Sequence, residues 1–185
     1  MIRLASLFQD HAILQRGQPV AVWGWGPPRS RIVINLGPHT GCGFTSARGR
    51  FEVWLPPPPE DGELTLTAAE ADNPEATTAC ARGLKAGEAW IASGQSNMAM
   101  TLADCGDLAS EAISKATDPD LRLFTVQKSA MLGPQDDVEG TWIPADPENA
   151  RAFSAVAYHF AARLRRELGV PVGVVVSAWG GTPIE

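Results

Sequence analysis

Apolar and polar residues alternate in several short segments of the chain, up to about Lys85. Ile32, Ile34 and Leu36 fall on every second position, and residues 51–55 show the same alternation. A period of two is typical of a strand with one buried and one exposed face. We therefore predict strands, with no helix between them, at residues 20–25, 31–36, 51–55, 63–67 and 78–84.

Turn signals separate these segments. Residues 47–50 predict a hairpin turn in which Gly49 supplies a positive φ. The four prolines at 56–59 cannot donate ladder hydrogen bonds, so the strand before them should end there. Short strands at this spacing favour a small β-sandwich over residues 1–86.

The pattern changes after Gly87. Residues 88–92 and 172–177 are short, mainly apolar runs, as expected of buried parallel strands, and residues 121–126 are a further strand candidate. Apolar residues four apart predict a helix over residues 107–116. Strands and helices therefore alternate in this part of the chain.

The clearest helix precedes the last strand. Its apolar residues share one stripe at helical spacing: Phe153, Val156, Ala157, Phe160, Ala161, Leu164 and Leu168. Gly169 follows where a C-cap glycine belongs. His159 lies next to the stripe, and we interpret it as a packing residue. Residues 129–148, rich in Pro, Asp and Gly, predict a long loop.

The order β-α-β-α-β predicts parallel strands with right-handed crossovers in a three-layer α/β sheet. We expect the flavodoxin-like strand order 2-1-3, in which the first and third strands are neighbours. The domains are thus a β-sandwich over residues 1–86 and an α/β domain over residues 87–185. We expect this second domain to be incomplete, because it has three strands and no closing helix.

Charge and composition narrow the functional classes. A net charge of −6 argues against a nucleic-acid-binding protein, and no apolar run is long enough to span a membrane. The first residues show no signal peptide. Cys42, Cys80 and Cys105 lack metal-ligand spacing and a disulfide framework, so we expect no metal site.

Candidate chemistry lies in two loops that follow strands, at residues 93–98 and 178–185. Ligands of open α/β sheets bind beyond the carboxyl ends of the strands, so these loops should face each other across one crevice. Ser96, at the start of a helix and preceded by Gly94, would expose its hydroxyl beside free backbone N–H groups. The arrangement suits acyl transfer.

Backbone donors and neutral amides complete this candidate site. Gly180 and Gly181 allow the backbone to approach a substrate and to aim N–H groups at a developing oxyanion. Gln95 and Asn97 are neutral donors next to Ser96. Each feature is common by itself, since a serine in such a loop is often only a helix N-cap and two glycines are often only a turn.

At these two loops the sequence resembles the sialate O-acetylesterase family, within the SGNH-type serine esterases. Residues 94–98 (GQSNM) match the nucleophile block of the family, and residues 179–185 (WGGTPIE) match its second block. Further similar segments follow in the order of the family, at residues 6–16, 19–25, 87–90 and 153–158.

The resemblance implies that Ser96 is the nucleophile, with its own N–H and that of Gly180 or Gly181 forming the oxyanion hole. It implies a β-sandwich ahead of the catalytic domain, and hydrolysis of acetyl esters on sugars such as O-acetylated sialic acid. It also implies that no metal or cofactor takes part. Members of the family are often periplasmic or secreted.

The sequence departs from the family at several points. Ala99 stands where an acidic residue is common, and neither the Gln-Gly-Glu loop nor the late Asp-X-X-His motif has a counterpart. A serine hydroxyl needs a general base, so we expect these 185 residues alone to be close to inactive.

A noncatalytic carbohydrate-binding protein is the alternative interpretation. Trp23, Trp25 and Trp54 could stack against a sugar, although we expect them to lie mainly in the β core.

Overall fold

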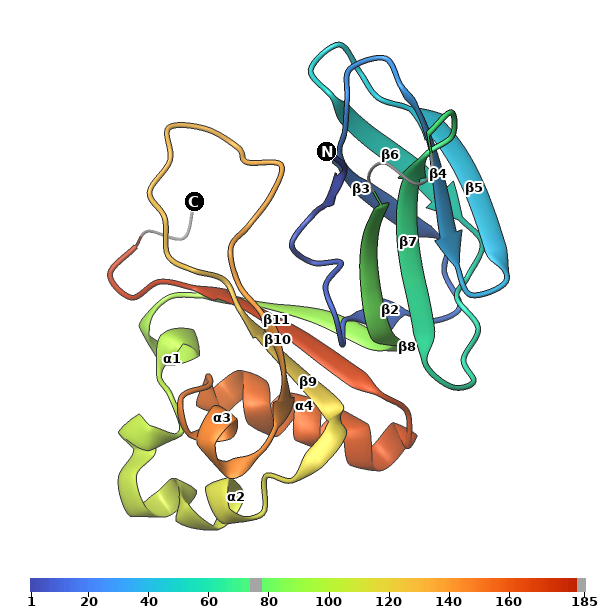
Figure 1. Cartoon of the computed structure of the whole chain (residues 1–185). Coiled ribbons are helices and arrows are strands. Elements are labelled where there is room, and N and C mark those ends of the chain that lie inside the picture. The colour runs from blue at the N-terminus through green and yellow to red at the C-terminus, as the bar shows by residue number, and fades with distance from the viewer. Residues whose placement is uncertain (74–77, 183–185) are drawn as a thin grey trace. The chain divides into compact units, whose positions relative to one another are not determined.

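The structure is a computed structural model that describes residues 1–73 and 78–182 (Figure 1). The chain folds into two compact units, Met1–Ala86 and Gly87–Glu185. The strand β8 (Thr78–Gly94) contributes to both units. Its first part pairs with β7 (Leu64–Glu70) in the first unit, and its second part pairs with β11 (Val172–Ala178) in the second unit.

The first unit contains two antiparallel sheets. One has the strand order β1-β3-β6, the other has the order β8-β7-β4-β5, and β2 pairs with β8. The bounds of these strands are β1 (Arg3–Leu4), β2 (Ile13–Gln15), β3 (Val20–Trp25), β4 (Arg31–Leu36), β5 (His39–Phe44) and β6 (Arg50–Leu55). All five strands predicted in this part of the chain are confirmed, although three of them extend further than predicted.

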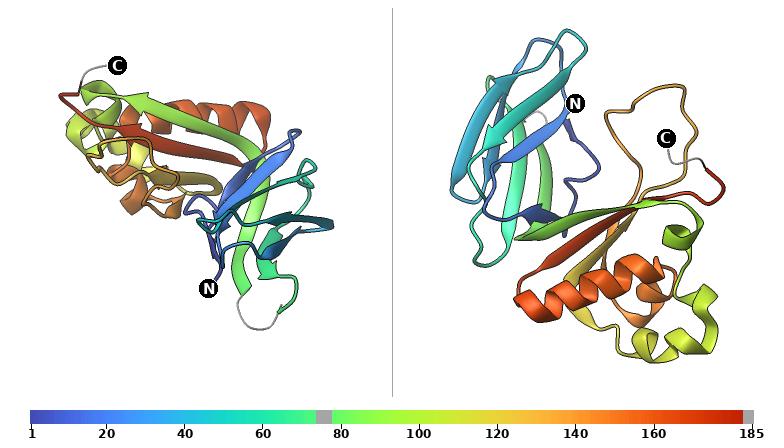
Figure 2. Two further views of the ribbon diagram at one scale, coloured as in Figure 1. Left: turned by 90° about the horizontal axis from the view of Figure 1, so that it is seen from above. Right: turned by 180° about the vertical axis from the view of Figure 1, so that it is seen from behind.

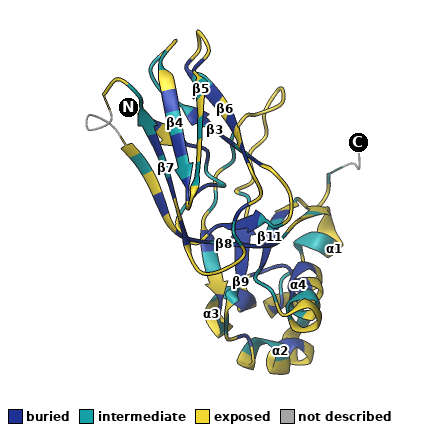
Figure 3. Ribbon diagram, turned by 90° about the vertical axis from the view of Figure 1, so that its right-hand side faces the viewer, coloured by how far each residue is buried: buried dark blue, intermediate teal, exposed yellow. Residues whose placement is uncertain are grey.

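Burial alternates along these strands (Figure 3). Ile32 and Ile34 of β4 and Phe51, Val53 and Leu55 of β6 are buried, while the alternate residues of both strands are partly or fully exposed. β5 approaches β6 closely, because a Cβ added at Gly41 would lie only 2.6 Å from Cδ2 of Leu55. The core of the first unit therefore forms between its two sheets.

The turn at residues 47–50 differs from its prediction. Gly49 has the expected positive φ, 82°. The strands on either side, β5 and β6, nevertheless belong to different sheets, so a hairpin is the wrong description. β5 was not predicted, because its sequence HTGCGF has two glycines and a single large apolar residue.

The tryptophans of the first unit do not form its core. Trp54 is 64% exposed, and Trp23 and Trp25 are half-buried, so the expectation of buried aromatic residues is wrong. The strand period explains this, because the intervening Val22 and Val53 take the buried face.

In the second unit the strands follow the order β10-β9-β11-β8, which is part of an eight-stranded sheet. β8 and β9 (Asp118–Thr125) run parallel to β11, and β10 (Trp142–Ala145) runs antiparallel to β9. The first and third predicted strands are neighbours, as expected. The order 2-1-3 is wrong, because the third strand, β11, lies between the other two.

Burial accounts for the observed order. Val172 and Val174 of β11 are completely buried, which suits a strand with a neighbour on each side. Trp90 and Ile91 of β8 are 44% and 76% exposed. The more apolar strand therefore takes the inner position.

The helices of the described residues all lie in the second unit. They are α1 (Ser96–Ala99), the 3-10 segment η1 (Ala103–Ala109), α2 (Ser110–Ser114), α3 (Pro147–Arg151) and α4 (Ala155–Leu168). The helix predicted at residues 107–116 is found in part, since its first residues end η1 and α2 follows directly at Ser110–Ser114. The loop predicted at residues 129–148 is wrong in its last part, where β10 and the start of α3 lie.

α4 packs against β9 and β11 (Figure 2). The Ser154 hydroxyl caps its first turn by accepting the N–H of Ala157, and Gly169 ends it with φ 67°. Its buried residues are mostly small: Ala155, Ala157, Tyr158 and Ala161. Small side chains on this face let the helix backbone lie close to the sheet.

The predicted apolar stripe of α4 is therefore only partly right. Val156, Phe160 and Leu168 are more than two-fifths exposed. Phe160 packs edge-on against Trp90 of β8, with ring centroids 5.2 Å apart. His159 is exposed on the same helix, so its interpretation as a packing residue is wrong.

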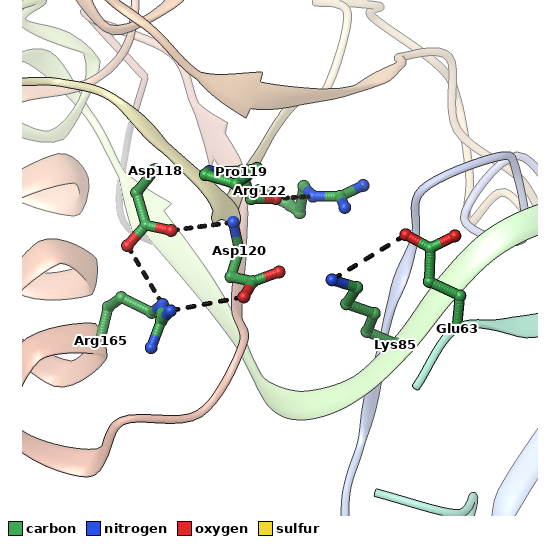
Figure 4. Close-up of polar contacts among 7 residues, drawn as sticks. All are labelled: Glu63, Lys85, Asp118, Pro119, Asp120, Arg122 and Arg165. Atoms are coloured by element: carbon green, nitrogen blue, oxygen red, sulfur yellow. Dashed lines mark hydrogen bonds and ion pairs between the residues drawn. The ribbon is translucent and has the colours of Figure 1, made fainter. Parts of the chain in front are cut away.

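Ion pairs connect α4 to the start of β9 (Figure 4). Arg165 Nε lies 3.1 Å from Oδ2 of Asp118, and the Arg165 guanidinium donates a hydrogen bond of 3.4 Å to Oδ2 of Asp120. Beside them, Arg122 is buried and donates from Nε to the carbonyl oxygen of Pro119. These contacts lie at the amino end of β9, opposite its carboxyl end.

Candidate active site

An open cavity of about 480 Å³ lies at the carboxyl ends of the parallel strands of the second unit. Residues 93–95, 126–129 and 177–179, together with Thr182, line it. These segments end or directly follow β8, β9 and β11, respectively. The cavity is thus where ligands bind in open α/β sheets.

The chain turns sharply from β8 into α1 at this cavity. Gly94 has φ 151°, and a Cβ there would lie 3.2 Å from Cβ of Met98. Gln95 is the N-cap residue, and Ser96 is the first residue of α1, as the sequence predicts. Gly94 therefore permits the bend that places Ser96 beside the rim of the cavity.

Contacts with neighbouring elements hold α1 in place. Its C-cap residue Met100 accepts the N–H of Ala155, the first residue of α4. Thr101 forms an isolated bridge with Ser154, whose hydroxyl lies 3.6 Å from the sulfur of Met98. The position of Ser96 is thus tied to the start of α4.

The Ser96 hydroxyl is exposed and donates to Oε1 of Gln95 at 3.3 Å. The backbone N–H of Ser96 points to the same oxygen, at 3.5 Å. An amide oxygen is too weak a base to remove the hydroxyl proton. In this state Gln95 caps the helix and contacts the predicted nucleophile.

The glycine turn after β11 meets Ser96. The Trp179 N–H donates to the Gly94 carbonyl oxygen at 3.1 Å, which joins the two loops. A Cβ built on Gly180 would lie 3.6 Å from Cα and 3.7 Å from Cβ of Ser96. Gly181 has φ 82°, and a Cβ built on it would have no atom within 4 Å. The structure thus brings the predicted serine and the predicted glycines together at one rim of the sheet.

One predicted substrate contact lies apart from the cavity lining, and part of the second sequence block is not described. Asn97 is exposed on α1 and does not line the cavity. Pro183, Ile184 and Glu185, the end of the second sequence block, lie outside the described residues.

The described lining contains no histidine, aspartate or glutamate. His11 and His39 belong to the first unit, and His159 is exposed on α4. Lys128 is the one ionisable side chain among the described lining residues. Sequence reasoning missed residues 127–129, although their place directly after the predicted strand at residues 121–126 was a usable signal.

The described residues hold no candidate for two other kinds of site. Among residues 1–73 and 78–182, no three His, Cys, Asp or Glu side chains are grouped so that they could hold a metal ion. No helix in this described part is long and apolar enough to cross a membrane.

Comparison with known proteins identifies relatives along almost the entire chain. The sialate O-acetylesterase of Rattus norvegicus is 30% identical over 198 residues, which cover 99% of this chain and 36% of the rat protein. The human protein of the same name is 29% identical over 99% of this chain and 38% of its own length. The chain spans little more than a third of the length of these relatives. No family model matches it.

A solved structure shares the same fold. The crystal structure of a carbohydrate acetylesterase from Xanthomonas citri is 37% identical to this chain and superposes with a TM-score of 0.91. The match covers 100% of this chain and 42% of the other. The resemblance inferred from the sequence motifs is thereby confirmed.

Proposed function

We propose that this chain, a homologue of the sialate O-acetylesterases over nearly its whole length, carries the nucleophile of an esterase that removes O-acetyl groups from sugars. One observation carries the proposal: the Gly180 turn lies against Ser96 beside an open cavity. A hydroxyl and backbone donors that converge on one point are the arrangement acyl transfer requires.

In the proposed reaction, Ser96 Oγ attacks the acetyl carbonyl carbon. The N–H groups of Ser96 and of Gly180 or Gly181 stabilise the oxyanion that forms. For this, the Ser96 N–H exchanges its long 3.5 Å contact with Gln95 for the oxyanion. The bond to the sugar oxygen then breaks, the sugar leaves with a proton, and water hydrolyses the acetyl-serine.

The substrate we propose is an O-acetylated sugar of the sialic acid type, after the names of the relatives. Gln95 lines the cavity and can hold the sugar through its amide once it releases Ser96. Asn97, exposed on the next turn of backbone, is a second proposed contact for the sugar.

We also propose that the 185-residue chain has little activity alone, because its described cavity residues include no general base. Loss of triad members in comparable serine enzymes costs on the order of a millionfold in kcat. Added imidazole should partly replace the base, since the cavity is open. Imidazole-dependent release of acetate from an acetylated sugar is the expected result.

The matched controls are two serines that line the cavity beside Ser96. Ser96→Ala should abolish the imidazole-dependent release above the background of imidazole alone. Ser93→Ala and Ser129→Ala, which remove hydroxyls that line the cavity near Ser96, should retain it. Release that persists in Ser96→Ala would exclude Ser96 as the nucleophile.

A noncatalytic glycan-binding role remains the second candidate, and the exposure of Trp54 favours it. Its indole Nε1 donates to Oε1 of Glu52 at 3.1 Å, and Glu52 also pairs with Arg50 at 3.0 Å. The ring is thus held in one orientation on the exposed face of β6. Sugar binding that is lost in Trp54→Ala, without any acetylation of Ser96, would support this role.

A further inference from the structure

The candidate active-site cavity carries a single charge among its described lining residues, the ammonium group of Lys128. The chain as a whole has a net charge of −6, whereas the described lining of this cavity has a cation and no acidic residue. The other lining residues are serines, small or apolar side chains, and amides or hydroxyls that carry no charge.

The chain has three lysines, and the other two are paired with carboxylates. Lys85 Nζ lies 3.9 Å from Glu63, and Lys115 Nζ lies 2.6 Å from Glu111. Within residues 1–73 and 78–182, the Lys128 side chain makes no ion pair or hydrogen bond. Its charge is therefore available to a ligand in the cavity.

The backbone on the N-terminal side of Lys128 is anchored although the side chain is exposed. The Val126 N–H donates to the carbonyl oxygen of Val176 in β11 at 2.9 Å. The Gln127 N–H donates to the carbonyl oxygen of Glu139 at 2.7 Å. These two hydrogen bonds fix where the Lys128 side chain starts, at the carboxyl end of β9.

We propose that Lys128 forms a subsite for an anionic group, and that it selects acetylated sugars bearing a carboxylate over neutral ones. This inference rests on the proposed function, because it assumes that the sugar occupies the cavity beside Ser96. An exposed lysine–carboxylate pair contributes modestly, so we expect about a fivefold preference at low salt. Raising the salt concentration should weaken the preference through screening.

The test compares two probes that differ in one charge, N-acetylneuraminate and its methyl ester. Their binding to the 185-residue chain is measured by ligand-observed nuclear magnetic resonance. The acid should bind about fivefold more tightly than the ester. In Lys128→Ala the two affinities should become equal, and Lys128→Arg should restore the difference. Lys115→Ala, a lysine outside the cavity, should leave the difference unchanged.

Equal affinities in the unmodified chain, an unchanged preference in Lys128→Ala, or no binding of either probe would each overturn the inference. The proposed function has a separate readout, the acetylation of Ser96 by a neutral acetyl ester. If Lys128→Ala fails to alter the preference while Ser96 is still acetylated, only the anionic subsite is refuted. If Ser96 is not acetylated, the proposed function itself fails.

Discussion

The contact between the two loops predicts opposite outcomes for two adjacent glycines. In Gly180→Ala the new methyl group would lie 3.6 to 3.9 Å from Cα, Cβ and N of Ser96, which is ordinary van der Waals contact. Gly180 also lacks a positive φ. The substitution should therefore preserve the fold, and by restricting the unfolded chain it should raise the free energy of unfolding by about 0.4–1 kcal/mol.

The same methyl group would occupy space beside the Ser96 hydroxyl. An acetyl ester would then approach Ser96 in a less favourable geometry, and we expect imidazole-dependent acetylation to slow by about tenfold or more. Gly181→Ala is the matched control, because no atom lies within 4 Å of its new Cβ but φ is +82°. A left-handed alanine should lower the free energy of unfolding by about 1–2 kcal/mol.

Denaturant unfolding and the rate of acetylation, measured on both glycine variants, test these expectations. Transitions of the two units should be fitted separately where they do not coincide. Gly180→Ala with an unchanged acetylation rate would show that this turn does not face the reacting group. Equal destabilisation by both substitutions would contradict the backbone geometry on which the reasoning rests.

Two further predictions concern α4. Burial, and secondarily the charge of Asp118, raises the pKa of Tyr158, the single tyrosine of the chain. Ultraviolet absorption should therefore show that this tyrosine releases its proton at higher pH in the folded protein than in denaturant. The resulting contribution to stability is present below about pH 10 and is lost as the pH rises through the folded-state pKa, and Tyr158→Phe should remove that loss. Ala161→Leu should destabilise the second unit by about 1–3 kcal/mol in denaturant unfolding, because the larger side chain overpacks a buried position. Phe160→Ala, at the exposed neighbouring position, should cost less. A larger cost for Phe160→Ala would indicate that Phe160 is buried, as the sequence predicts.

Local patterns predicted the elements well where a single physical signal dominates. The alternation in β4 and the C-cap at Gly169 each follow from one short-range rule, and both are found. The Gly94 bend before Ser96 was likewise predictable, because a strand that enters a helix this sharply needs a residue without a Cβ.

Features that depend on tertiary packing were not predictable in this way. β11 lies between β9 and β8 because its residues are more completely buried than those of β8, and this difference in burial arises only when the sheet is packed. Phe160 is exposed because α4 packs against the sheet through the face that carries its buried alanines. Lys128 carries no motif, and it became a candidate only when the ends of three strands were found around one cavity.

The most direct measurement is the location of the acetyl group after the chain reacts with an acetyl ester in the presence of imidazole. The acetyl-serine formed during this reaction should be detected by peptide mass spectrometry after the reaction is stopped with acid. The account predicts acetylation of Ser96, and none of Ser93 or Ser129. Acetyl groups on those serines, or on lysines alone, would contradict it.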